Sequence, residues 1–304
     1  MSESNRIRVA YRPAGGVGNW QVMRRTSGGP ALTMNTENSN EVIGDRLVSD
    51  LILQSAETGG SLEFEFSATS FDDWLSSAFC KAWSVDDPSV GTDTLLIGVD
   101  DILYDVLLSY QDIDRHIKFN SMRVGQLDLN VEAGATMTGT IAFAGTDYDA
   151  EYDPSGDTFD AATTTRVLRG VDVGTISLDG TPMTGTCIPS LSLSLNNNYQ
   201  AGFCLGSLSP GKQVKGTAEP TGTLGISMTA DTYDTWVELI AQSELSLAFP
   251  FGDGTNSYTL TIPRLKANGD LPVPGANEIV NWEWNYTALR DENGIALQLT
   301  RTTA

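Results

Sequence analysis

The chain has 304 residues, with 18 Lys and Arg against 39 Asp and Glu, and a formal net charge of −21. This balance argues against tight nucleic-acid binding, which rests on clustered Lys and Arg, and no run of about 18 apolar residues suggests a membrane span. The 30 glycines and 12 prolines favour short strands and turns over long helices. The length predicts about two domains.

Cysteine usage and the first residues bear on where the chain folds. Cys80, Cys187 and Cys204 are too scattered for a disulfide framework, and we expect buried free thiols. The segment MSESNRIRVAYRPAGG lacks the apolar stretch of a signal peptide. These features predict a protein made and assembled in the cytoplasm.

The first clear structural unit in chain order is a strand followed by a helix. Leu62, Phe64 and Phe66 alternate with polar residues, which predicts a strand with one buried face. After Thr69 the apolar period becomes helical, and Ser70 is the expected N-cap. The apolar helix positions are Phe71, Trp74, Leu75 and Ala78.

This unit occurs twice. Residues 222–237 match residues 60–75 without a gap, at a constant offset of 162 residues. In the second unit Thr232 is the expected N-cap. The repeat predicts four aromatic core positions at equivalent places, namely Phe71, Trp74, Tyr233 and Trp236. The identical pairs are Gly60/Gly222, Leu62/Leu224, Ala68/Ala230, Asp72/Asp234 and Trp74/Trp236.

Weaker matches on both sides of the unit extend the repeat over the whole chain. Leu32–Asn35 resembles Leu193–Asn196, and residues 119–143 align with 260–284. We therefore expect a mainly β, α+β protein made of two tandem related β-sandwich or barrel domains, 1–165 and 166–304, each flanked by one short helix. The charge is uneven between them, at −16 for the first and −5 for the second.

Enzymatic and metal sites have little support in the sequence. His116, the only histidine, lies in a polar segment without a nucleophile motif, and no zinc or EF-hand spacing occurs. We expect no catalytic, cofactor-binding or metal-binding residues. One binding alternative remains. Trp282 and Trp284 share one face of a predicted strand, as in a sugar-stacking platform of a β-sandwich carbohydrate-binding or adhesin module, although the repeat favours a buried face.

Three stretches carry a family resemblance. Residues 38–51 read NSNEVIGDRLVSDL, residues 59–62 read GGSL, and residues 71–79 read FDDWLSSAF. They resemble the patterns E-S-x-E-I-R-x-D-R-x-I-x-D-L, G-G-S-I and Y-D-D-L-L-E-A-A-L of the major tail tube proteins of long, non-contractile-tailed bacteriophages. Asp45 matches, whereas Asn38 replaces Glu and Ile43 replaces Arg.

The resemblance implies a structural virion protein. Tail tube proteins polymerise as stacked rings into a hollow tube, the conduit for viral DNA during genome ejection, and their inner sheets join into a β-lined channel. The implied partners are further copies of the chain and other tail proteins such as the tape measure, distal tail and terminator proteins. DNA passes without tight binding, and neither a cofactor nor a membrane anchor is implied. Because each chain carries two equivalent domains, we expect homotrimeric rings with pseudo-six-fold symmetry.

Two sets of residues are candidates for tube function. Glu63 and Glu65 lie on the polar side of the repeated strand and are expected to face the lumen, where cations would retard DNA. The segment Trp83–Ile97 follows the first helix and occupies the place where the first repeat has its extra residues. Its acidic residues, Asp86, Asp87 and Asp93, are the expected ring-to-ring contacts.

Overall fold

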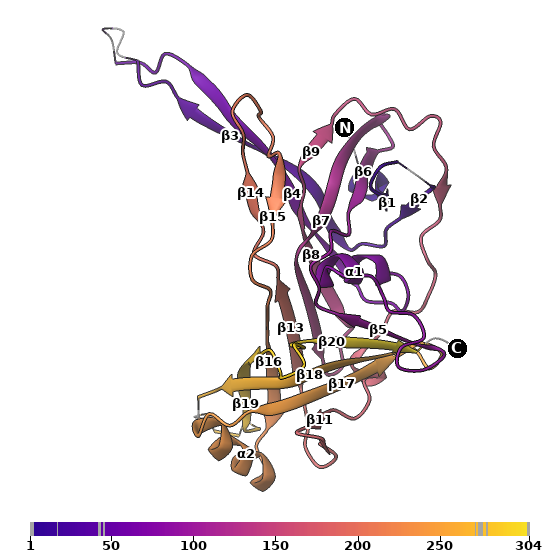
Figure 1. Cartoon of the computed structure of the whole chain (residues 1–304), viewed down its shortest axis with the longest axis vertical. Helices are drawn as coiled ribbons and strands as arrows, with labels where there is room; N and C mark the ends of the chain where they lie inside the picture. Colours follow the sequence, from indigo (N-terminus) through magenta and orange to yellow (C-terminus); the bar gives the residue numbers. More distant parts are fainter. Residues whose placement is uncertain are drawn as a thin grey trace.

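The computed structural model describes residues 3–16, 18–41, 44, 46–270, 272, 276–277 and 279–302. Ile43 and Asp45, two residues of the stretch discussed above, lie outside the described residues. Figure 1 shows a mainly β chain with helices α1 and α2, as the sequence predicts. No helix of the described part is long and apolar enough to cross a membrane.

The elements follow the repeat. In residues 3–165 they are η1 (Ser4–Arg6), β1 (Ile7–Pro13), β2 (Trp20–Val22), β3 (Ser27–Asn38), β4 (Leu51–Glu65), α1 (Asp72–Phe79), β5 (Thr92–Leu96), β6 (Tyr104–Tyr110), β7 (Arg115–Glu132), β8 (Thr138–Ala144), β9 (Asp147–Asp149) and β10 (Phe159–Asp160). In residues 166–302 they are η2 (Gly170–Asp172), β11 (Ser177–Leu178), β12 (Thr181–Pro182), β13 (Ser190–Asn196), β14 (Gln200–Gly202), β15 (Lys212–Val214), β16 (Glu219–Ser227), α2 (Ala230–Ile240), β17 (Leu245–Gly252), β18 (Ser257–Asn268), β19 (Asn281–Ala288) and β20 (Gln298–Thr302).

One antiparallel sheet runs through both repeats. Its strand order is β3–β4–β8–β7–β13–β16–β19–β18, with four strands from each repeat in the same relative order. Strict alternation explains these strands. In β13 every second residue is a buried Leu, and in β19 Trp282, Trp284 and Tyr286 are buried between exposed polar residues. We call this the continuous sheet.

Other strands form outer layers over the buried side. β6 pairs with β1 and with the first half of β7, and β17 pairs with the part of β18 from Ser257 to Leu265. β5 pairs with β20, so a strand of the first repeat joins the outer layer of the second. Buried apolar residues of both repeats form one large core cluster between these layers.

The two helices begin differently from what the sequence predicts. Ser70 does not cap α1, because its hydroxyl contacts Thr163 and Thr165 instead, and Phe71 occupies the N-cap position. The helix α2 begins earlier, after Thr229, whose hydroxyl accepts a hydrogen bond from the Thr232 backbone N–H. Thr232 is therefore the third helical residue rather than the cap, and it completes a capping box.

Candidate assembly site

The seam between the repeats is a regular pair of strands. β7 and β13 pair antiparallel over seven residues, with Leu129 opposite Leu193 and Asp128 opposite Ser194. Residues opposite each other share a face of the sheet, so the apolar residues of both strands enter the same core. Neither repeat has a free edge at this seam, and the strands of the second repeat continue those of the first.

The solvent face of the continuous sheet carries mostly uncharged polar residues and carboxylates. Following the pairings across the sheet, one row of side chains contains Ser27, Glu63, Thr140, Asp128, Ser194, Thr221, Thr287 and Lys266. The next row contains Glu65, Thr138, Asn130, Ser192, Thr223, Asn285 and Asn268. Lys266 is the one cation in these two rows, and it lies on the terminal strand.

The predicted lumen residues lie on this face. Glu63 and Glu65 are exposed on β4, and the Ser27 hydroxyl donates a 2.6 Å hydrogen bond to Glu63. Sequence reasoning missed Asp128 and Lys266 as members of the same row, because their place depends on which strands pair. It is the pairing that brings Asp128 to the same side as Glu63.

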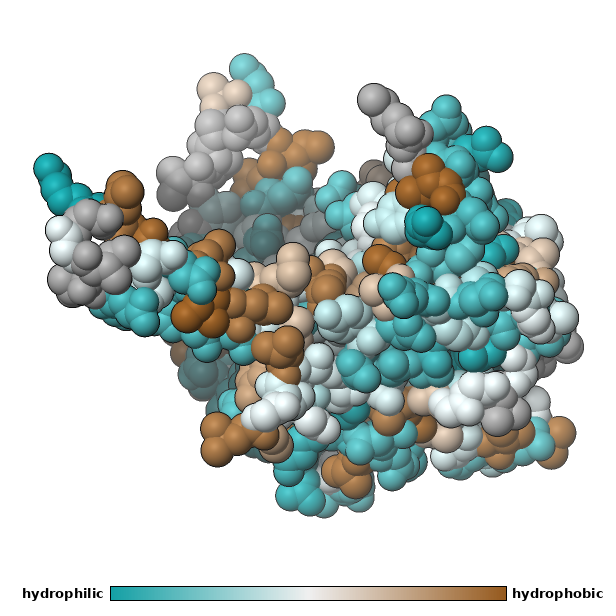
Figure 2. Space-filling view, turned by 90° about the horizontal axis from the view of Figure 1, so that it is seen from above, coloured by the Kyte–Doolittle hydropathy of each residue, from teal (hydrophilic) through white to brown (hydrophobic). Residues whose placement is uncertain are grey.

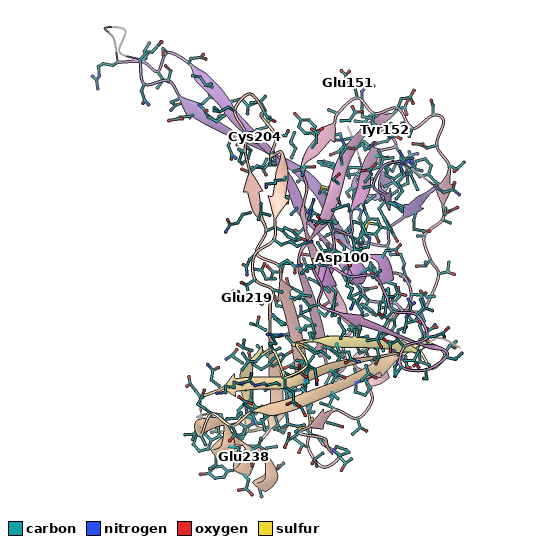
Figure 3. All side chains as sticks on the ribbon, in the orientation of Figure 1. Asp100, Glu151, Tyr152, Cys204, Glu219 and Glu238 are labelled. Carbon is teal, nitrogen blue, oxygen red and sulfur yellow. The ribbon has the colours of Figure 1, made fainter. Side chains whose placement is uncertain are left out.

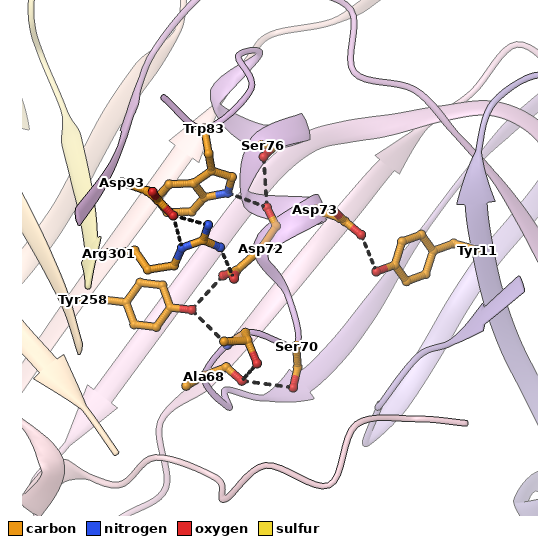
Figure 4. A network of polar contacts seen from close by, with 11 residues as sticks. Tyr11, Ala68, Ser70, Asp72, Asp73, Ser76, Trp83, Asp93, Tyr258 and Arg301 are labelled. Atoms are coloured by element: carbon orange, nitrogen blue, oxygen red, sulfur yellow. Dashed lines mark hydrogen bonds and ion pairs between the residues drawn. The ribbon is translucent and has the colours of Figure 1, made fainter. Parts of the chain in front are cut away.

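A polar network joins α1 to the second repeat (Figure 4). The Tyr258 hydroxyl donates to Asp72 Oδ1 over 2.8 Å, and Arg301 donates to Asp72 Oδ2 over 2.5 Å. Arg301 also donates through Nε to Asp93 over 3.0 Å, while its guanidinium lies 4.4 Å from the centre of the Trp83 ring. The first turn of α1 is therefore attached to β18 and β20.

The pKa values of the two carboxyl groups in this network, Asp72 and Asp93, are shifted in opposite directions. Burial raises the pKa of Asp72 against the effects of its hydrogen bond from Tyr258 and its ion pair with Arg301. Hydrogen bonding from Arg301 lowers the pKa of Asp93. At Asp72 the effect of burial outweighs these favourable contacts, whereas at Asp93 the hydrogen bonding from Arg301 outweighs the effect of burial.

The connection between β13 and β16 adds a second attachment, at the end of α1. The Asn197 amide donates to the backbone carbonyls of Ala78 and Val124. Lys215 donates to the carbonyls of Val99 and Asp100 and forms a 2.8 Å ion pair with Asp101. Both ends of α1 are thus bound by residues of the second repeat, which leaves the helix buried.

The hairpin of β3 and β4 projects beyond the rest of the chain (Figure 1). Figure 2 shows hydrophobic residues on and beside this projecting arm. Met34, Leu51 and Ile52 are 64%, 60% and 46% exposed. The equivalent hairpin in the second repeat, β14 and β15, lies against β4 instead, through a hydrogen bond from the Ala56 N–H to the Leu208 carbonyl. Cys204, labelled in Figure 3, belongs to this region.

The predicted ring-contact segment is partly taken up by contacts within the chain. Asp93 lies in β5 and is buried by its ion pair with Arg301. The Asp86 carboxylate accepts a hydrogen bond from the Gly91 N–H, and Asp87 is exposed. Contact with another ring stays a prediction for this segment, and the structure gives Asp93 a role inside the chain.

The four aromatic positions of the repeat have different surroundings. Phe71 and Trp74 are 2% and 1% exposed, whereas Tyr233 is 46% exposed and Trp236 is partly buried. Tyr233 is therefore not a core residue of the single chain. The periodicity placed it on an apolar helix face, but the described residues of the chain leave that face half exposed at Tyr233.

The two tryptophans of the alternative sugar site are buried. Trp282 and Trp284 are 3% and 2% exposed, so they are core residues and not an exposed sugar platform. Nε2 of His116 lies 3.2 Å from the carboxylate of Asp114. No cluster of three metal-ligating side chains occurs among the described residues. Cys80 is buried as expected, but Cys187 and Cys204 are exposed free thiols, contrary to the sequence expectation.

Comparison with known proteins identifies the family. No curated protein matches the chain. A family model described as phage tail tube protein matches residues 4–288, nearly the whole length. The match includes both repeats and every strand of the continuous sheet. The chain belongs to the phage tail tube protein family and is a structural component of the phage tail.

Proposed function

We propose that the protein polymerises as stacked rings of three copies, and that the tube so formed conducts viral DNA during genome ejection. The observation that carries this proposal is the continuous sheet, in which two equivalent blocks of four strands meet at the pairing of β7 with β13. Residues 1–165 and 166–304 are then two quasi-equivalent tube domains. Three copies supply six such positions and give a ring pseudo-six-fold symmetry.

The two ends of the continuous sheet support closure of the ring. Among the described residues, β3 pairs only with β4, and Lys266–Asn268 of β18 pair only with β19. Unpaired edges on a long sheet invite pairing with another chain. In the ring, β18 of one copy pairs with β3 of the next, in the manner of β7 and β13, so that no edge remains.

The solvent face of the continuous sheet is suited to line a DNA channel. Phosphate binding requires clustered cations, and each Lys or Arg on the wall would add to affinity for the cargo. Glu63, Glu65 and Asp128 on this face repel phosphate, and hydroxyl and amide groups occupy most other positions. DNA therefore passes without tight binding.

Microscopy of the assembled protein tests the ring. Cryo-electron microscopy of purified tubes should give rings with three-fold symmetry in which alternate positions differ, most clearly at the β3–β4 hairpin. Six copies per ring would overturn the proposal. The proposed partners are other tail proteins such as the tape measure, distal tail and terminator proteins, and the proposed site of assembly is the host cytoplasm, before incorporation into the virion.

The lumen assignment has its own test. Replacing Glu63 and Glu65 by Lys should slow genome delivery while tubes still assemble, because the new cations attract passing phosphate. Glu151→Lys with Asp153→Lys, which changes the same charge on an exposed loop outside the continuous sheet, is the matched control. Ejection kinetics measured on phage particles should change only for the first pair, and equal kinetics for both pairs would reject this face as the lumen.

A further inference from the structure

The outer face of α2 carries apolar residues at positions that are buried in α1. Along the repeat, Phe71, Leu75 and Ala78 correspond to Tyr233, Val237 and Ile240. The first three are 2%, 2% and 0% exposed, and the second three are 46%, 50% and 60% exposed. The sequence thus keeps an apolar face on α2 that the described residues of the chain leave about half exposed. Figure 3 labels Glu238, which lies beside it on the same helix at one end of the molecule.

The residues that cover α1 show what such a face binds. Leu75 and Phe79 of α1 line one small apolar cavity together with Leu191 and Leu193 of β13. The second repeat thereby closes over the helix of the first. The polar contacts of Asp72 with Tyr258 and Arg301 hold the start of α1, and Asn197 binds its last turn.

Several elements of this junction have a counterpart elsewhere in the chain. Asp234 repeats Asp72, and it makes no hydrogen bond or ion pair that is recorded with a described residue. Leu32 of β3 repeats Leu193 of β13. Its side chain is partly buried against the main core, and among the described residues β3 pairs on one edge only, with β4. The start of β7 repeats the start of β18, and Arg115 there has no described carboxylate within ion-pair distance.

The shape of the chain agrees with this correspondence. The β3–β4 hairpin projects at one end of the molecule, and α2 lies at the other end (Figure 1). The two surfaces cannot meet within one chain. They meet when copies follow one another around a ring, as the second repeat follows the first.

We propose that the outer face of α2, formed by Tyr233, Val237 and Ile240 with Asp234 at its start, binds the first repeat of a second copy of the chain, with Val237 against Leu32. This inference rests on the ring proposed above and names the contact that closes it. The junction inside one chain is the template for the junction between chains.

Crosslinking tests the contact directly. In a background with Cys187→Ser and Cys204→Ser, Val237→Cys and Leu32→Cys are combined and treated with a short bismaleimide before and after assembly. Assembled protein should give covalent dimers and trimers, and unassembled protein should give neither. The pair Val171→Cys with Leu32→Cys is the control, since Val171 is 71% exposed on η2. Tubes that form normally but do not crosslink at Val237 would overturn the inference.

A substitution series separates this inference from the ring itself. Ile240→Asp should leave the monomer folded, as judged by circular dichroism and thermal unfolding, because Ile240 is exposed, and it should reduce tube yield at least tenfold. Val171→Asp should assemble normally. If the parent protein forms no tubes, the proposed function fails. If the parent and Ile240→Asp form the same tubes, the function stands and the docking of α2 is wrong.

Discussion

The helices α1 and α2 occupy the same place in the repeat and have different surroundings in the folded chain. α1 lies between the continuous sheet, the layer of β1 and β6, and the second repeat, so its apolar residues are buried. α2 packs on one side only, with Leu239 and Trp236 toward the core. An amphipathic pattern therefore identifies an apolar face, and the neighbouring layers decide whether that face is core or interface.

The largest expected difference between the two helices concerns the repeated tryptophan. Trp74→Ala removes a ring that packs against Tyr11, Tyr104 and Phe143, and it should cost about 3–5 kcal/mol of unfolding free energy. Trp236→Ala should cost about 1–2 kcal/mol, because that ring is partly exposed. Urea unfolding of unassembled protein measures both. Equal losses would show that the two helices are equally packed in the monomer.

The second prediction concerns the polar junction. Arg301→Ala leaves Asp72 and Asp93 without their cation, and it should cost about 2 kcal/mol, below the 3–5 kcal/mol typical of fully buried pairs because Arg301 is partly exposed. Arg264→Ala breaks an exposed pair with Glu244 and should change stability far less. The same urea assay tests this pair of variants. A comparable loss for both would contradict a special role for the junction.

The smallest effects are expected in the pH dependence. The pKa of Asp93 lies below the ordinary Asp value of 3.8, so the unfolded chain binds more protons in the window between them, and stability falls as the pH drops through it. The pKa of Asp72 is raised, so the folded chain binds more protons just above 3.8, and stability falls there as the pH rises. These two slopes have opposite signs.

Asparagine variants separate the two contributions. Asp93→Asn should reduce the loss of stability on acidification below pH 3.8, whereas Asp72→Asn should remove the decline that accompanies rising pH above it. Urea midpoints measured across this range, before and after each substitution, report the slopes. Parallel curves for the two variants would contradict the assigned shifts.

The local pattern of residues was sufficient to predict strands and helices, but not the distant residues that they contact. Alternation in β4 and β19 identified the buried faces, and the change of period after Thr69 located α1. The ion pair of Asp72 with Arg301 joins residues 229 positions apart, and a local sequence pattern cannot predict such a contact. Asp72 recurs as Asp234 in the repeat, but that recurrence does not indicate Tyr258 or Arg301 as partners.

The residues of the candidate surfaces likewise fall into those that the sequence pattern predicted and those that only the tertiary fold reveals. Glu63 and Glu65 were placed on an exposed strand face by alternation alone, because strand geometry sets which residues share a face. Asp128 and Lys266 entered the same row only through strand pairing, which depends on the tertiary fold. Tyr233 was expected in the core because the repeat equates it with Phe71, but Phe71 packs against Phe64 and Phe66, whereas Tyr233 is 46% exposed.

The pairing of β5 with β20 also has a consequence for the order of synthesis. Thr92–Leu96 gain their strand partner, and Asp72 and Asp93 gain their cation, only when residues 298–302 have left the ribosome. The first repeat of a chain that stops early keeps an open strand edge and two uncompensated carboxylates. Such fragments are poor building blocks and good protease substrates. The last strand thus completes both the pairing of β5 and the charge compensation of Asp72 and Asp93.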